Sequence, residues 1–270
     1  MLRSIQAICS FKYAPLVDSP GSRGGAGEVA LLVDFDNVFP PNKRDVESLV
    51  PELNRWVSFI HALLPTQTLR IRLYGGWLEN GVMTNAASAL QAGIPRDFFP
   101  LAAEVDGKPR LIRGSVELAT RLVAVPEIEW KHSFRAREGI PRLRLAQKPR
   151  PDGCIRHDAC PIDAVQRMSR NRRRVCQHEG CLARNDAAFL LHEQKMVDAL
   201  LSCDAIEFAR RETHVVVMSN DLDVLPSIAT IASISKASVV LVRGVEAGDT
   251  DLYSEALQDL GVEVASLEAA

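Results

Sequence analysis

The sequence predicts an α/β protein in which a mostly parallel sheet lies between layers of helices. Two kinds of segment carry this prediction. Apolar runs of strand length, such as Val29–Val33 and Val215–Met218, are typical of strands buried on both faces of a parallel sheet. Amphipathic stretches of helix length separate such runs. Regular alternation of strands and helices favours a three-layer α/β/α arrangement.

The expected elements follow one another in a simple order. Residues 1–27 are predicted to be a flexible lead-in, because glycine and serine are frequent near its end, and the domain itself is expected over 28–265. The predicted elements are strand 29–33, helix 43–64, strand 69–74, helix 80–92, helix 187–208, strand 214–218, helix 222–233, strand 238–242, helix 250–260 and strand 262–265.

An insertion over about 115–184 is predicted to interrupt this alternation. The segments 128–137 and 142–145 favour a hairpin that has no evident partner in the sheet. Residues 131–184 contain fourteen Lys or Arg and five Asp or Glu, about +9, whereas the rest of the chain has eighteen against twenty-nine, about −11. A basic segment beside an acidic body suits a polyanion held near a carboxylate-metal centre.

Composition and motifs exclude several classes of protein. The chain has 270 residues, a net charge of −2 and no apolar run of the length that spans a bilayer. Without a clear export signal, a reducing cytoplasm is the expected setting, so clustered cysteines indicate metal binding before disulfides. The sequence contains no Gly-x-Ser-x-Gly, no Walker motif and no Gly-x-Gly-x-x-Gly after a strand, which argues against serine-hydrolase, phosphate-loop and dinucleotide chemistry.

Carboxylates occur where a parallel sheet keeps its ligand site. Asp34 directly follows the first strand, Asp221 and Asp223 follow strand 214–218, and Asp198 is expected near a helix start. Carboxylates that converge there repel one another, and Mg²⁺ resolves the repulsion because it prefers oxygen ligands. Such a site activates water and stabilises a phosphodiester under attack. A single aspartate after a strand also fits a turn or helix cap, and Asp221 fits the cap of a helix at 222.

Three segments together resemble the NYN branch of the PIN-like ribonucleases. They are Leu31-Leu-Val-Asp-Phe-Asp-Asn37, Lys195-Met-Val-Asp-Ala-Leu-Leu-Ser-Cys-Asp204 and Val215-Val-Val-Met-Ser-Asn-Asp-Leu-Asp223. The resemblance covers roughly 28–75 and 187–265. The chain departs from the family pattern at Asn220, where glycine is common, at Val224, where an aromatic residue is common, and at Asp36, an additional carboxylate.

The resemblance implies a PIN-like fold and a metal-dependent ribonuclease that hydrolyses RNA phosphodiester bonds. It implies that Asn37 and Ser219 orient the loop after the first strand and the substrate phosphate. The residues that it assigns to Mg²⁺ or Mn²⁺ binding and to activation of water are Asp34, Asp198, Asp221 and Asp223.

The cysteine-rich part of the insertion, 150–184, predicts a structural zinc site. Four thiolates, or three with one histidine, satisfy the tetrahedral geometry that zinc adopts in closed sites. Unligated thiols in a loop are the alternative. The expected ligands are Cys154, Cys160, Cys176 and Cys181, one of which His157 or His178 replaces in the mixed set.

Arginines between the two cysteine pairs predict contact with RNA. Arg172, Arg173 and Arg174 suit phosphates through charge and bidentate hydrogen bonds, although such a run also fits a solvated face. Trp77 and Trp130 fit either base stacking or, better, the core.

Two other functions compete with the ribonuclease. An Asp-x-Asp after the first strand also resembles the haloacid-dehalogenase phosphatases, in which Asp34 would be the nucleophile. That class needs a lysine between a later Ser or Thr and a further acidic pair, and here Ser219, Asp221 and Asp223 share one strand end. The second alternative is a catalytically inactive PIN-like module that binds RNA or a protein.

Overall fold

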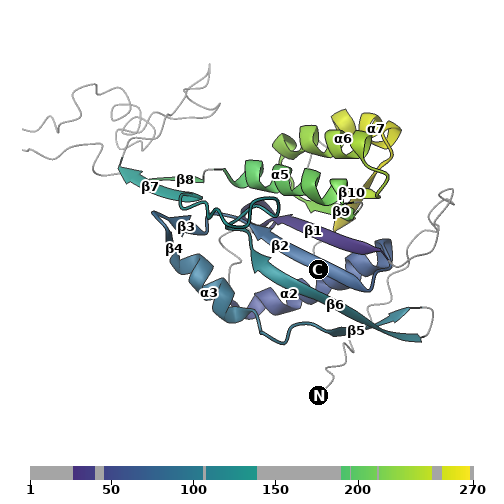
Figure 1. The fold of residues 1–270 in the computed structure, drawn as a ribbon, viewed down its shortest axis with the longest axis horizontal. Coiled ribbons are helices and arrows are strands. Elements are labelled where there is room, and N and C mark those ends of the chain that lie inside the picture. Colours follow the sequence, from purple (N-terminus) through teal and green to yellow (C-terminus); the bar gives the residue numbers. More distant parts are fainter. Residues whose placement is uncertain are drawn as a thin grey trace, which may run out of the picture. The chain divides into compact units, whose positions relative to one another are not determined.

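The computed structural model describes residues 27–39, 46–105, 108–138, 190–194, 196–211, 213–244 and 251–267. The chain divides into two compact units, one formed by Met1–Ser133 with Gln194–Ala270 and the other by Phe134–Glu193. Within the described residues, the first unit contains a seven-stranded sheet with helices against it (Figure 1). A separate two-stranded sheet pairs β7 (Phe134–Glu138) with β8 (Leu190–Gln194).

The large sheet is mostly parallel. Its strand order is β11-β10-β9-β1-β2-β6-β5, and β5 runs antiparallel to β6 at one edge. Strands β3 (Leu78–Glu79) and β4 (Val82–Met83) form a small hairpin of their own. The strands of the large sheet are β1 (Glu28–Asp34), β2 (Thr68–Tyr74), β5 (Leu101–Val105), β6 (Lys108–Leu118), β9 (His214–Met218), β10 (Val239–Gly244) and β11 (Val262–Leu267).

Helices cover both faces of this sheet (Figure 1). Side chains alternate along β1, so that Leu31 and Val33 enter one core while Ala30 and Leu32 enter the other. The first core includes buried residues of α2 (Val46–Leu63) and α3 (Asn85–Gly93), and the second those of α5 (Val197–Arg210), α6 (Leu225–Ile234) and α7 (Asp251–Asp259). Full burial of each large apolar side chain contributes about 1.5–3 kcal/mol, which makes two continuous cores the main source of stability.

The direction of the strand order reverses between β1 and β9. From β1 the chain continues to β2 on one side, and it later returns to build β9, β10 and β11 on the other side. Ligand sites of open α/β sheets lie at such reversal points, beyond the carboxyl ends of the strands. Asp34 ends β1 and Ser219 follows β9, so both residues lie at this point.

Most predicted elements of the first unit are confirmed. The strand predicted over 214–218 coincides with β9, and the helix predicted over 222–233 is a short 3-10 turn, η3 (Leu222–Val224), continued by α6. The predicted mostly parallel sheet with helical layers is present. Residues 1–26 lie outside the described part of the chain.

The helix predicted from residue 187 is wrong at its start. Residues Leu190–Gln194 form β8, and α5 begins only at Val197. Leucine, glutamate and glutamine favour a helix locally, but pairing with β7, far away in sequence, overrides that preference.

The main sheet and its unit also extend further than expected. The insertion is predicted to begin near 115, whereas β6 runs to Leu118 inside the large sheet and the first unit reaches Ser133. The predicted hairpin partner 142–145 lies outside the described residues, and β7 pairs with β8 instead.

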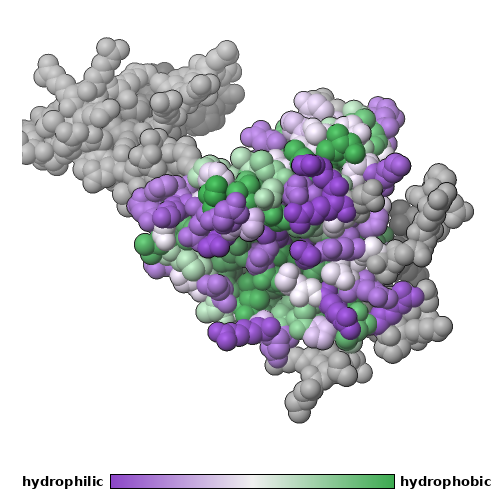
Figure 2. Space-filling view, in the orientation of Figure 1, coloured by the Kyte–Doolittle hydropathy of each residue, from purple (hydrophilic) through white to green (hydrophobic). Residues whose placement is uncertain are grey.

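The described surface carries no extended apolar face in the view of Figure 2, where hydrophilic residues surround smaller hydrophobic areas. Exposed apolar side chains such as Val82, Ile234 and Tyr253 belong to different elements, β4, α6 and α7. Among the described helices, none combines the length and the apolar character needed to cross a bilayer.

Candidate functional site

A row of polar side chains lies along the carboxyl edge of the sheet, on the face that α5 and α6 cover. Val33, Met218 and Val242 are level with one another in the parallel register and belong to the core on the opposite face. Because side chains alternate, the next residue of each chain segment points to the α5 face. The resulting row, from β10 to β2, is Arg243, Ser219, Asp34 and Tyr74.

Ser219 holds the centre of this row together. Its hydroxyl donates to Oδ2 of Asp34 at 2.8 Å and accepts the backbone N–H of Asp221 at 3.0 Å. Ser219 is fully buried and Asp34 is 4% exposed. One hydroxyl therefore fixes the β1 carboxylate against the loop that carries Asp221.

The environment of Asp34 favours its neutral form. Burial is the main cause that raises the pKa of this carboxyl to about 6, and the nearby carboxylates of Asp198 and Asp221 raise it further. Hydrogen bonds from Ser219 and from the Asn37 side chain lower the pKa and offset part of this effect. Asp34 is thus a buried acid whose ionisation is penalised by its neighbours and eased by two hydrogen-bond donors.

Three further aspartates surround this carboxyl. Asp221 caps η3 by accepting the backbone N–H of Asp223 at 3.0 Å, so the cap expected from the sequence is present. Asp198 lies in the first turn of α5. Although the residue as a whole is exposed, desolvation of the Asp198 carboxyl raises its pKa, and Asp221 and Asp223 add to the shift. The four aspartates therefore share one electrostatic neighbourhood.

These carboxylates do not form a finished metal cage. As they stand, the described residues include no group of three or more His, Cys, Asp or Glu side chains that could hold a metal ion. The type of donor nevertheless fits a hard divalent cation, because all four side chains offer carboxylate oxygens. Their mutual repulsion also opposes close approach in the absence of a cation.

Two residues at which the chain departs from the NYN ribonuclease pattern have structural roles. Asp36 turns to the neighbouring strand end, where its Oδ2 accepts the backbone N–H of Gly76 at 3.1 Å. Asn220 accepts the N–H of Gly244 at 2.7 Å through Oδ1 and so ties the β9 loop to the end of β10. These side chains brace the edge of the sheet on either side of Asp34 and Ser219.

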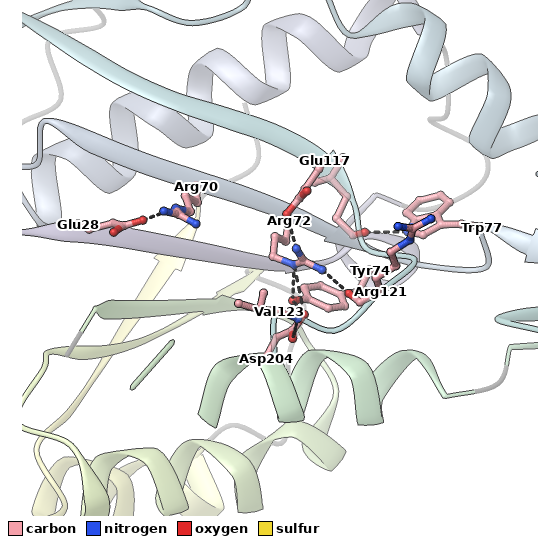
Figure 3. Close-up of polar contacts among 10 residues, drawn as sticks. Glu28, Arg70, Arg72, Tyr74, Trp77, Glu117, Arg121, Val123 and Asp204 are labelled. Atoms are coloured by element: carbon pink, nitrogen blue, oxygen red, sulfur yellow. Dashed lines mark hydrogen bonds and ion pairs between the residues drawn. The ribbon is translucent and has the colours of Figure 1, made fainter. Parts of the chain in front are cut away.

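Asp204 belongs to a different, closed network (Figure 3). Its Oδ2 accepts the Tyr74 hydroxyl at 2.8 Å and pairs with Nε of Arg72 at 3.2 Å, and its Oδ1 accepts the N–H of Val123 at 2.8 Å. Arg72 also donates to Glu117 and to the carbonyl of Arg121. Asp204, the later aspartate of the Lys195–Asp204 segment, therefore anchors α5 to the sheet, and its carboxylate oxygens are occupied.

Sequence reasoning missed Arg243, which lies in the same row as Asp34. The residue is 4% exposed, although the end of a strand normally places an arginine in solvent. The available signal was the position of Arg243 in Val239-Val-Leu-Val-Arg243, where alternation puts it on the same face as the buried Val239 and Leu241.

Several predicted residues lie outside the described part of the chain. The predicted zinc ligands and the three arginines of the insertion fall in 139–189, so their arrangement stays a prediction. Cys203 is an exposed free thiol on α5. Trp77 is buried and donates from Nε1 to the carbonyl of Leu73, and Trp130 packs against the core, as expected for core residues.

Comparison with known proteins adds no evidence on the family or function of the chain. No family model matches the chain, and no curated protein or solved structure matches it. The fold and the site define an α/β protein with clustered carboxylates at the reversal point of a mostly parallel sheet.

The closed network predicts a large loss of stability in Arg72→Met. Asp204 is fully buried and would lose its cationic partner, so we expect the free energy of unfolding to fall by about 3–5 kcal/mol. Urea denaturation measures this. The matched control is Arg70→Met on the same strand as Arg72, which breaks a partly exposed ion pair with Glu28 of β1 and costs at most about 1 kcal/mol. Equal losses in the two variants would contradict the structural role.

Metal-free protein is expected to lose stability as the pH rises from about 4 to about 6. The pKa of Asp34 is higher in the folded state (about 6) than the ordinary 3.8, so ionisation costs more in the folded state, by at most about 3 kcal/mol. The loss is absent below this window and complete above it. Thermal unfolding in EDTA across this range, compared with Asp34→Asn, measures the effect. An unchanged slope in the variant would assign the pH dependence to other groups.

Proposed function

We propose that this chain is a metal-dependent ribonuclease of the NYN type, with a PIN-like fold, that hydrolyses RNA phosphodiester bonds. The observation that carries the proposal is the Asp34 carboxyl at the reversal point of the sheet, which accepts a hydrogen bond from Ser219 and whose pKa is raised by burial and further by two neighbouring aspartates. A protein that needed only a stable sheet edge would gain from an apolar residue at this position.

The carboxylates supply the donors for Mg²⁺ or Mn²⁺. In the proposal Asp34, Asp198, Asp221 and Asp223 hold the ion, which would lower the pKa of a bound water and offset the charge of the phosphate. Three of these side chains come from the ends of β1 and β9, and Asp198 comes from the start of α5. A cation at their centre relieves the repulsion that raises the pKa of Asp34 and Asp198.

Residues around the carboxylates set their geometry. Ser219 and Asn37 hold Asp34 by hydrogen bonds, which favour its ionised form and fix its orientation. The cap interaction holds Asp221 at the start of η3, directly beyond β9. Preorganised ligands of this kind let the site bind the cation with little rearrangement of the backbone.

The insertion supplies the proposed RNA contacts. Its net charge of about +9 over 131–184 attracts a polyanion to an otherwise acidic protein. In the proposal Arg172, Arg173 and Arg174 contact phosphates, and a structural zinc ion on the cysteines fixes the loop that carries them.

The decisive experiment is cleavage of labelled RNA with Mn²⁺ by the wild type, Asp34→Asn and Asp221→Asn. Loss of an outer partner of a metal ligand typically lowers activity 10–100-fold, so loss of a ligand should lower it by at least about 100-fold. The matched control is Asp97→Asn, which changes an exposed aspartate and should retain wild-type activity.

The same assay separates the alternatives. A phosphatase would leave RNA intact and hydrolyse p-nitrophenyl phosphate in an Asp34-dependent reaction. A binding module would retain RNA without cutting it. Either result from folded wild-type protein with Mn²⁺ would refute the proposed ribonuclease.

Ser219→Ala should impair catalysis without removing a metal ligand. The variant loses the hydroxyl that lowers the pKa of Asp34, so we expect activity to fall roughly 10–100-fold and the acid limb of the pH–rate profile to move to higher pH. Ser227→Ala is the control, because its hydroxyl donates to the backbone carbonyl of Val224, at the end of η3, and to none of the aspartates. A pH profile identical to that of the wild type would exclude this role for Ser219.

A further inference from the structure

Arg243 is a buried cation at the edge of the carboxylate site. It lies near the end of β10, next to Ser219 in the row, and is 4% exposed, the same as Asp34. Asp221 acts on it electrostatically across the end of β9. As a whole residue, Arg243 is therefore as little exposed to solvent as Asp34, which centres the proposed site.

The hydrogen-bonding capacity of Arg243 is not used up. Its Nε is fully buried and has no hydrogen-bond partner in the part of the chain that the structure describes. None of the ion pairs between described residues involves Arg243. A buried guanidinium with an unused N–H is costly to fold, because it has lost water without gaining an acceptor.

Arg72 shows what a structural arginine looks like in the same sheet. It also points to the α5 face, but its donors reach Tyr74, Glu117 and the carbonyl of Arg121, and its charge is paired with Asp204. The contrast indicates that the partner of Arg243 is a ligand that arrives from outside the fold. That ligand must accept hydrogen bonds and carry negative charge.

The nearby carboxylates are already engaged in other directions. Asp34 accepts from Ser219, and Asp221 accepts from the N–H of Asp223. Arg243 and Asp34 lie two strands apart, so their Cα atoms are about 9.6 Å apart at the usual strand spacing. A phosphate bound to a cation on Asp34 falls within reach of the long arginine side chain from that distance.

We propose that Arg243 is a substrate-binding residue that donates hydrogen bonds to a non-bridging oxygen of the RNA phosphate held at the carboxylate site. This inference rests on the proposed function. The carboxylates and their cation would bind one side of the phosphate, and the guanidinium would bind the other. The charge on Arg243 also offsets repulsion between the phosphate and the aspartates.

The test compares Arg243→Met and Arg243→Lys with the wild type in three measurements: melting temperature, Mn²⁺ affinity without RNA, and kcat/KM for cleavage of a labelled single-stranded RNA. For Arg243→Met we expect a melting temperature equal to or above that of the wild type, because an unpaired buried charge is removed. Mn²⁺ affinity should not fall, because removal of a positive charge near Asp221 does not disfavour a cation there. Cleavage should fall roughly 10–100-fold, as expected for hydrogen bonds to a charged group, and Arg243→Lys should restore part of it.

Other results would overturn the inference. A clear fall in melting temperature in Arg243→Met, as expected for Arg72→Met, would make Arg243 a structural residue. Wild-type kcat/KM in Arg243→Met, while Asp34→Asn is inactive, would leave the ribonuclease standing and exclude Arg243 from substrate binding. If the wild type cuts no RNA, the proposed function and this inference both fail.

Discussion

The hydrogen bond between Ser219 and Asp34 is the contact on which the carboxyl edge of the sheet depends. It joins the ends of β1 and β9, the two strands between which the direction of the strand order reverses. Burying a carboxyl there is unfavourable, and its raised pKa reflects that cost. The parallel register sets the geometry: because Val33 is level with Met218, Asp34 and Ser219 come together as the next residues of their chains, on the same face.

Two groups of buried polar side chains on this face of the sheet differ in how the free-energy cost of their burial is offset. Around Arg72, Asp204 and Tyr74, donors and acceptors are matched inside the protein, and a backbone N–H completes the set. Around Asp34, carboxylates face one another, and Arg243 has an unused donor. The first arrangement stabilises the fold without any ligand. In the second, the proposed cation and phosphate would supply a positive charge and an acceptor that the described residues do not provide.

The sequence predicted the positions of Asp34, Asp221 and Asp223 beyond strand ends better than it predicted the second unit, and the reasons are physical. Continuous apolar runs such as Val215–Met218 indicate buried parallel strands, and an aspartate directly after such a run lies at the carboxyl edge of the sheet. Strand β8 was not predicted, because its residues favour a helix locally and its partner β7 is far away in sequence. The alternation of residues along β10 indicates which face Arg243 lies on. Its burial depends on the pairing of β10 with β9 and on tertiary packing, which the neighbouring residues do not predict.

The arrangement of the four aspartates also explains why the site is unfinished in the fold alone. Three of the four carboxylates are positioned by local structure. The Ser219 hydroxyl holds Asp34, the cap interaction holds Asp221, and the first turn of α5 carries Asp198. These interactions orient the side chains but do not bring the carboxylates into contact, because repulsion between carboxylates grows as they approach in a medium of low dielectric constant. A divalent cation reverses the sign of that interaction. In the proposed metal site the fold would supply approximate positions and the ion would draw the carboxylates together, with a free-energy gain that includes relief of the repulsion around Asp34.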